Sequence, residues 1–131
     1  HTRSSAASDV YKRQVITSFV FGFLHFFNPE VDKLGNGIMF YYVGTGFFFG
    51  IITLMDEGTE LAVGLHIANN LITALLVTAD WTAFQTESLY TDISEPSLGI
   101  ELFIYLVIVY PATLLYFSKK FNWSNWRKKL I

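Results

Sequence analysis

The chain has 131 residues, enough for one ordinary domain, and its composition is strongly apolar. Hydrophobic residues make up 52% of it and aromatic residues 18%, whereas charged residues make up only 15%. Soluble domains carry about 25% charged residues, so this composition excludes a disordered chain and a coiled coil. The net charge of −2 provides no basic face for phosphates and excludes a nucleic-acid partner. Without Cys, the chain can form no disulfide, thiolate metal site or cysteine nucleophile.

Residues 1–14 form a short polar segment that is unlike everything downstream. Residues 4–14 resemble a translated transposon sequencing adapter fused to a truncated reading frame. They contain no apolar core followed by a small-residue cleavage site, so they are not a signal peptide. A short native cytoplasmic tail is the alternative. We therefore expect residues 1–14 to be non-native and the native sequence to begin at Val15, with the intact protein extending upstream.

Four apolar segments follow, at residues 15–27, 38–55, 61–79 and 100–117. Each of the last three is long enough to cross about 30 Å of hydrocarbon at about 1.5 Å per residue. We expect the first to be short because it has lost its beginning. The pattern predicts an all-α fold for residues 15–131. We expect a polytopic transmembrane helix bundle of about four membrane helices, truncated at the N-terminus.

Glycine and proline inside these segments predict details of the helix packing. The second segment carries Gly44, Gly46 and Gly50, and glycines at such spacing let neighbouring membrane helices approach closely. The fourth segment contains Pro111, where we expect a kink.

The basic residues predict the orientation in the membrane. Residues 118–131 contain five Lys or Arg with two Trp between them, which is typical of a cytoplasmic tail lying at the interface. Residues 80–99 contain four acidic residues and no basic ones, as expected on the opposite side. We predict an integral, multi-pass protein of a prokaryotic plasma membrane, in contact with membrane lipids. Residues 56–60 then lie on the cytoplasmic side and residues 28–37 on the external side.

Two histidines, His25 and His66, lie inside apolar segments. Ionisable groups at membrane depth are costly, so they usually face the protein interior and have a function. Residues four apart share a helix face, which pairs Phe21 with His25 and His66 with Asn70. We expect both histidines to point into one cleft between the first and third helices, roughly 10 Å or less apart. The alternative is that both are packing residues, bonded to neighbouring carbonyls.

Several known kinds of hydrolytic site do not fit these residues. A His-Glu-x-x-His zinc site needs Glu after its first His, but Phe26 follows His25 and Ile67 follows His66. No Asp lies within the four apolar segments, which excludes an aspartyl site. Ser18 is not surrounded by a Gly-x-Ser-x-Gly motif.

The motifs Phe21-x-x-x-His25 and His66-x-x-x-Asn70, separated by a glycine-rich helix, resemble the CPBP family. This family contains CAAX prenyl proteases and bacteriocin-processing proteins, also called Abi proteins. Its members carry EExxxR on one helix, FxxxH on the next and HxxxN two helices later. The resemblance extends from Val15 to about Thr78 and includes the connector at residues 56–59.

The resemblance implies an intramembrane protease that acts on a prenylated or otherwise membrane-associated peptide, or on a leader peptide. By this resemblance, the Glu of EExxxR and His25 would activate a water molecule. His66 and Asn70 would stabilise the oxyanion, or His25, His66 and Asn70 would hold a divalent metal such as zinc. Family descriptions divide between a metalloprotease and a metal-independent glutamate protease. Asn69 is 100° from Asn70 around the helix, so we expect it to support the motif by bonding a neighbouring helix or a backbone carbonyl.

The chain departs from the family pattern because it contains no EExxxR motif. Asp56-Glu57 is followed by Glu60 and Leu61, with no Arg. In the family this motif precedes FxxxH, so we expect it to have been lost at the adapter-like junction. No residue of this chain is expected to replace the missing Glu, and we expect the chain as written to be an inactive fragment.

Two other functions fit the sequence. A family member without catalytic activity could serve as a membrane scaffold or immunity protein. A transporter-like protein could use His25 and His66 as a relay, but it would need further intramembrane carboxylates, and only Glu101 at a helix entrance is available.

Overall fold

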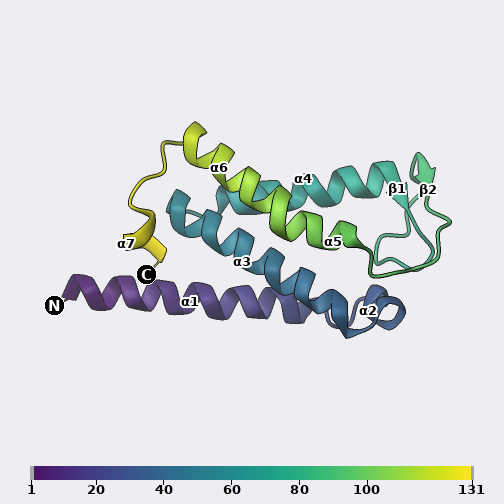
Figure 1. Cartoon of the computed structure of the whole chain (residues 1–131), viewed down its shortest axis with the longest axis horizontal. Helices are drawn as coiled ribbons and strands as arrows, with labels where there is room; N and C mark the ends of the chain where they lie inside the picture. The colour runs from purple at the N-terminus through teal and green to yellow at the C-terminus, as the bar shows by residue number, and fades with distance from the viewer. Residues whose placement is uncertain (1, 131) are drawn as a thin grey trace.

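The computed structural model describes residues 2–130 as an almost entirely helical chain (Figure 1). Its helical elements are α1 (Thr2–Leu24), α2 (Pro29–Leu34), the 3-10 turn η1 (Asn36–Ile38), α3 (Met39–Asp56), α4 (Glu60–Leu76), α5 (Ile100–Ile104), the π-helical turn η2 (Tyr105–Val109), α6 (Tyr110–Lys120) and α7 (Trp126–Leu130). Two short strands, β1 (Val77–Thr78) and β2 (Tyr90–Thr91), pair in parallel. The predicted all-α fold class is confirmed.

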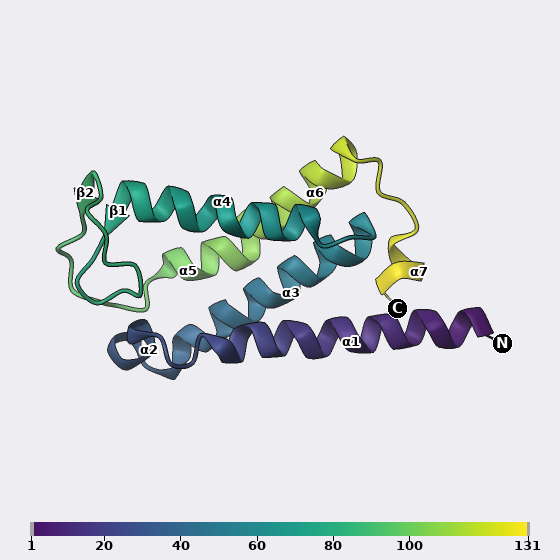
Figure 2. The same cartoon turned by 180° about the vertical axis from the view of Figure 1, so that it is seen from behind.

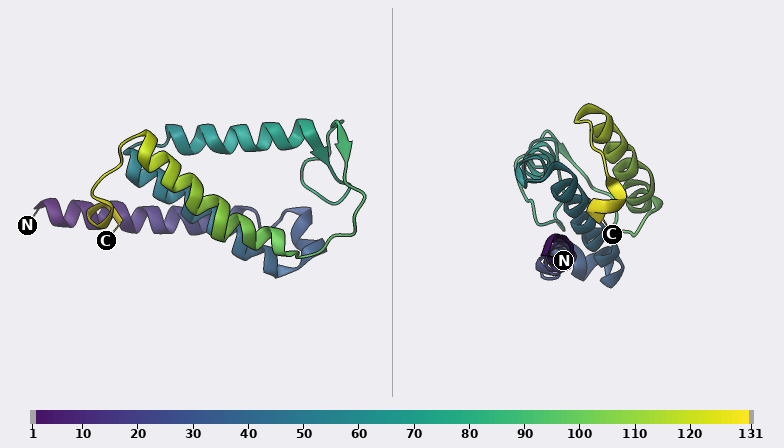
Figure 3. Two further views of the ribbon diagram at one scale, coloured as in Figure 1. Left: turned by 45° about the horizontal axis from the view of Figure 1, so that its top comes forward. Right: turned by 90° about the vertical axis from the view of Figure 1, so that its left-hand side faces the viewer.

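Helix α3 lies at the centre of the bundle. Helix α1 packs on one side of it, and α4 and the α5–η2–α6 rod lie on the other, as the end view shows (Figure 3). The four long helical elements alternate in direction, so α2 and the strands lie at one end of the molecule (Figures 1 and 2). The α3–α4 connector and α7 lie towards the other end.

The boundaries of the first, third and fourth predicted helices differ from the structure, and the fourth ends at Lys120 rather than Phe117. The first helix ends at Leu24 rather than Phe27, and it begins at Thr2, within the segment set aside as non-native. The origin of residues 1–14 stays a prediction. The third helix ends at Leu76 rather than Ala79, because β-branched Val77 and Thr78 leave the helix and pair with β2.

Glycines bring the backbones of α1 and α3 into close contact, as the sequence predicted. A Cβ added at Gly46 would run into the backbone carbonyl of Ser18, and one added at Gly50 would meet the hydroxyl of Ser18. Ser18 is only 2% exposed in this contact. Gly44 faces a different neighbour, the side chain of Leu106 on η2.

This contact predicts that Gly46→Ala destabilises the bundle. The Ser18 carbonyl belongs to a helix backbone and cannot move aside, so we expect a loss of about 1–3 kcal/mol in the free energy of unfolding. Gly64→Ala is the matched control, because nothing lies within 4 Å of a Cβ added there. It should be neutral or stabilise the helix by about 0.5–1 kcal/mol. Unfolding in mixed micelles by SDS titration measures both variants, and equal stabilities would contradict the packing.

The irregularity expected at Pro111 takes the form of a π-helical turn. Helix α6 begins at Tyr110, and η2 comes directly before it. Proline has no N–H and cannot bond the carbonyl four residues earlier. A π turn is one of the ways in which a helix accommodates such a defect while continuing.

Polar contacts join the elements at each end of the bundle. The Lys129 ammonium lies 2.8 Å from the Glu57 carboxylate and 3.1 Å from the Met55 carbonyl. Lys129 holds the pKa of Glu57 below its ordinary value through this hydrogen bond and its charge. At the opposite end, the Ala83 N–H donates to Glu30 Oε1 over 2.8 Å. The connector and the tail therefore share one end, as the predicted topology requires.

The outer faces of the bundle are apolar. Two helices, Asn36–Asp56 and Ile100–Lys120, are each 21 residues long and apolar enough to cross a membrane, and Glu60–Leu76 is apolar but shorter. Large exposed apolar side chains lie on α1, α4 and α6, including Phe23, Ile67 and Leu115. Broad apolar surfaces are rare on soluble monomers, whereas a bilayer accommodates them.

Candidate functional site

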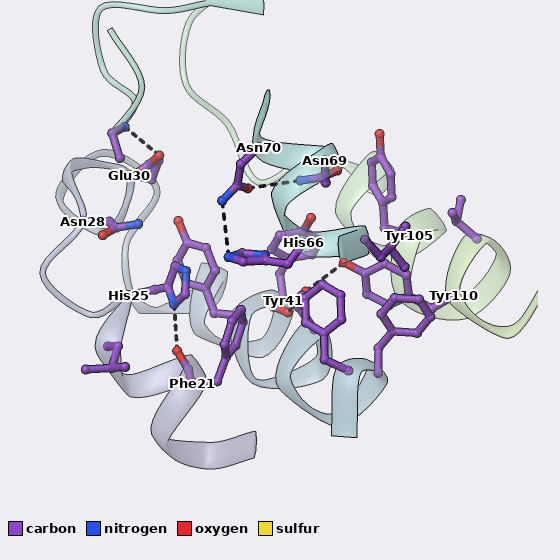
Figure 4. A pocket seen from close by; sticks show the side chains of 18 of the residues that line it. Phe21, His25, Asn28, Glu30, Tyr41, His66, Asn69, Asn70, Tyr105 and Tyr110 are labelled. Atoms are coloured by element: carbon purple, nitrogen blue, oxygen red, sulfur yellow. Dashed lines mark hydrogen bonds between the residues drawn. The ribbon is translucent and has the colours of Figure 1, made fainter. Parts of the chain in front are cut away.

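A cavity of about 470 Å³ lies against α3, with α1, α4, η2 and the β1–β2 loop contributing to its lining. All five residues that the sequence singled out line this cavity: Phe21, His25, His66, Asn69 and Asn70 (Figure 4). The expected convergence of the two motifs in one cleft is therefore observed.

His25 lies just beyond the end of α1, where the chain turns towards α2. Its ring stacks on Tyr42 of α3 with the ring centroids 4.7 Å apart. Its Nδ1 lies 2.7 Å from the backbone carbonyl of Phe21. A carbonyl only accepts hydrogen bonds, so Nδ1 carries the proton. In neutral His25 the lone pair is therefore on Nε2.

His66 lies in the second turn of α4, between two phenylalanine rings. Its centroid is 5.4 Å from that of Phe21 and 5.3 Å from that of Phe49, both in edge-to-face geometry. The Phe21 centroid is in turn 4.7 Å from that of His25. Both imidazoles therefore lie against the Phe21 ring. The distance between the two imidazole centroids is at most the sum of their distances to the Phe21 centroid. This meets the expected limit of roughly 10 Å.

The motif asparagine lies beside His66. Asn70 Nδ2 is 3.3 Å from His66 Nε2, and this amide can donate to the imidazole lone pair (Figure 4). Asn69 Nδ2 donates to Asn70 Oδ1 over 3.4 Å. The expectation that Asn69 bonds another helix or a backbone carbonyl is therefore wrong. Asn69 is largely exposed on α4, and its amide instead reaches the next side chain.

The two histidines lie at different positions along their helices, but this difference does not separate them. Counted from the segment ends, His25 lies at the end of its helix and His66 near the start of its own. The two nevertheless meet because α4 begins level with the middle of the long helix α1 (Figures 1 and 3).

The sequence analysis missed one acidic residue of the cavity. Glu30, in the first turn of α2, is the only Asp, Glu, Lys or Arg that residues 2–130 contribute to the lining. Its Oε1 accepts from the Ala83 N–H, whereas its Oε2 is buried without a partner among residues 2–130. Glu30 follows His25 by five residues, and this proximity was the signal that could have revealed it. Residues 28–37, which contain Glu30, lie outside the apolar segments in which site residues were expected.

Aromatic and hydroxyl groups line the inner end of the cavity. Thr45 Oγ1 lies 2.8 Å from the Tyr110 hydroxyl, and Tyr110 stacks on Phe48 with centroids 4.2 Å apart. Tyr41 and Tyr105 complete this wall. These contacts join α3 to α6 across 65 positions of sequence, and no local pattern signals them.

The cavity brings together two histidines and an asparagine as possible metal ligands. Catalytic zinc is usually held by three His, Cys, Asp or Glu ligands. Among residues 2–130, no three such side chains are grouped to hold a metal ion. His66 Nε2 faces the Asn70 amide, and His25 Nδ1 faces a carbonyl. The Nδ1 contact leaves Nε2 of His25 free, as in metal-bound histidines whose other ring nitrogen donates to a carbonyl, and the metal role predicted for His25, His66 and Asn70 stays a prediction.

Comparisons with known proteins agree with the two motifs. Residues 3–72 match the model of a family described as "Type II CAAX prenyl endopeptidase Rce1-like". An uncharacterized protein of Bacillus subtilis (strain 168), YyaK, is 31% identical over 64 residues. That match covers 49% of this chain and 21% of YyaK, so the chain spans a small part of its relative's length. No solved structure matches the chain.

The family match covers more than half of the chain and includes both motifs, FxxxH and HxxxN. The family is one of membrane-embedded proteases. The chain belongs to the Rce1-like family of type II CAAX prenyl endopeptidases.

Proposed function

We propose that the cavity lined by His25, His66 and Asn70 is part of the active site of an intramembrane endopeptidase. Its substrate is a prenylated or otherwise membrane-associated peptide C-terminus, or a leader peptide. One observation carries the proposal: two distant motifs, each with an intramembrane histidine, meet in one cavity with an amide beside one imidazole.

The geometry supports a specific division of the chemistry. His25 Nε2 has a free lone pair and can accept a proton from the attacking water. The water oxygen then bonds to the scissile carbonyl carbon, and the carbonyl oxygen becomes an oxyanion. Asn70 has a second amide N–H beyond the one that faces His66 and can donate it to this oxyanion. The C–N bond then breaks, and the leaving nitrogen takes the proton.

His66 and Asn69 position the oxyanion donor. His66 accepts from one N–H of Asn70, and Asn69 donates to its oxygen, so the amide is held from both sides. Such fixed donors stabilise developing charge without reorganising during the reaction. The donor set favours the metal-independent scheme for this family member.

His25 would act together with a second base, the carboxylate of the Glu in an EExxxR motif. That motif would lie in a segment preceding FxxxH. Four membrane spans, a cytoplasmic C-terminus and a prokaryotic plasma membrane complete the proposal. The basic residues of the tail then lie among lipid headgroups on the cytoplasmic side.

An activity assay of two chains tests this function. Residues 15–131 are expressed alone, and again behind an upstream segment bearing EExxxR from a close relative; the second is termed the complemented chain. Both are assayed in liposomes against a prenylated peptide, with products identified by mass spectrometry. Losing a general base usually slows catalysis by about 10²–10⁴-fold, so we expect turnover from the complemented chain only.

Each other outcome has a defined meaning. No cleavage by the complemented chain would support the alternative of a membrane scaffold or immunity protein. Cleavage by residues 15–131 alone would place the base within this chain, with Glu30 as the first candidate.

A further inference from the structure

The end of the cavity near α2 is rich in hydrogen-bond acceptors and carries the carboxylate of Glu30. Glu30 Oε2 is buried and has no partner among the described residues. His25, on the same side of the cavity, has its lone pair on Nε2 (Figure 4). Asn28 and Tyr42 also line this cavity.

The backbone holds Glu30 in this place. The Ala83 N–H donates to Oε1, so one carboxylate oxygen is tied to the loop that closes this end of the cavity. The other oxygen, Oε2, accepts no hydrogen bond from the described residues. A buried carboxylate oxygen without a donor is costly, and a cation that approaches it recovers the lost hydration.

We propose that Glu30 binds the ammonium or guanidinium group of a basic residue in the peptide substrate. Such a group carries several N–H donors, which suit an end that offers the Glu30 carboxylate and the side-chain oxygens of Asn28 and Tyr42. The scissile bond would then lie farther along the cavity, between His25 and the His66–Asn70 pair. This inference rests on the proposed function and makes Glu30 a specificity residue.

A binding experiment on the full chain tests it without requiring catalysis. The chain is placed in nanodiscs of neutral lipid, which removes attraction between basic peptides and the bilayer. The probes are fluorescein-labelled farnesylated peptides in which one Lys is moved through otherwise neutral positions. Each is paired with a peptide carrying norleucine at the same position, and affinity is measured by fluorescence anisotropy.

We expect one Lys position to bind at least about tenfold more tightly than its norleucine partner, as a buried charged hydrogen bond requires. Glu30→Gln should abolish this preference while leaving norleucine peptides bound as before, because Gln keeps the shape and the acceptor for Ala83. Asp32→Asn is the matched control: it removes a charge from the exposed side of the same short helix, and the preference should remain.

Three results would overturn the inference. The first is equal affinity of the Lys and norleucine peptides for the native chain, including no measurable binding of either. The second is a preference for Lys that persists in Glu30→Gln. The third is a loss of that preference in Asp32→Asn as large as in Glu30→Gln. The proposed function fails on a different observation, the absence of cleavage by the complemented chain. The two failures are therefore distinguishable.

Discussion

His25→Phe in the complemented chain should lower kcat by about 10²–10⁴-fold while leaving the bundle folded. Phenylalanine preserves an aromatic ring for the stack on Tyr42 and the contact with Phe21. It removes the Nε2 lone pair, which the proposed chemistry uses to accept a proton from water. Liposome turnover, together with the free energy of unfolding in mixed micelles, measures the two effects separately.

This substitution decides between catalysis and packing. If His25 serves only to fill the space between α1 and α3, the phenylalanine variant should retain most of its activity. Activity within threefold of the parent, with unchanged stability, would therefore show that His25 is a packing residue. A joint loss of activity and stability would also indicate that His25 is a packing residue.

Asn70→Ala should raise the barrier by about 3 kcal/mol, a loss of about 10²–10³-fold in kcat, if its amide donates to the oxyanion. Substrate affinity should change little, because the donation develops only in the transition state. Steady-state kinetics of the complemented chain separates kcat from KM.

Asn69→Ala is the matched comparison for Asn70→Ala. Asn69 contacts the Asn70 oxygen at 3.4 Å and is largely exposed, so its removal loosens the amide without removing the donor. We expect less than about a tenfold loss in kcat, since a weak exposed hydrogen bond contributes at most about 1 kcal/mol. Equal losses in the two variants would contradict the assignment of the oxyanion donor to Asn70.

Patterns within single segments predicted much of this fold and site. Long apolar blocks predicted the all-α class, and the glycines of the second segment predicted a close approach to a neighbouring helix, which the structure identifies as α1 for Gly46 and Gly50. The four-residue spacings of FxxxH and HxxxN predicted which side chains share a face, and both pairs line the cavity. These features depend on helix periodicity, which the sequence displays directly.

Features that depend on contacts between segments could not be predicted in this way. Glu30 enters the cavity because the Ala83 N–H, 53 positions later, holds its carboxylate. Tyr110 joins the inner wall because it meets Thr45 from another helix. The end of α4 at Leu76 depends on pairing with a second strand, and hydropathy alone extends that helix too far.

Paired cysteines test most directly whether the FxxxH and HxxxN motifs of α1 and α4 meet at a substrate-binding site. The chain contains no Cys, so His25→Cys with His66→Cys introduces the only two thiols. The control pair combines His25→Cys with Ile72→Cys, because Ile72 is on α4 and 56% exposed. A short bifunctional methanethiosulfonate should crosslink the first pair much faster than the control pair, and a prenylated peptide should slow that reaction. Equal crosslinking rates for the two pairs would contradict the convergence of the motifs, and a rate unaffected by the peptide would contradict its role as the substrate site.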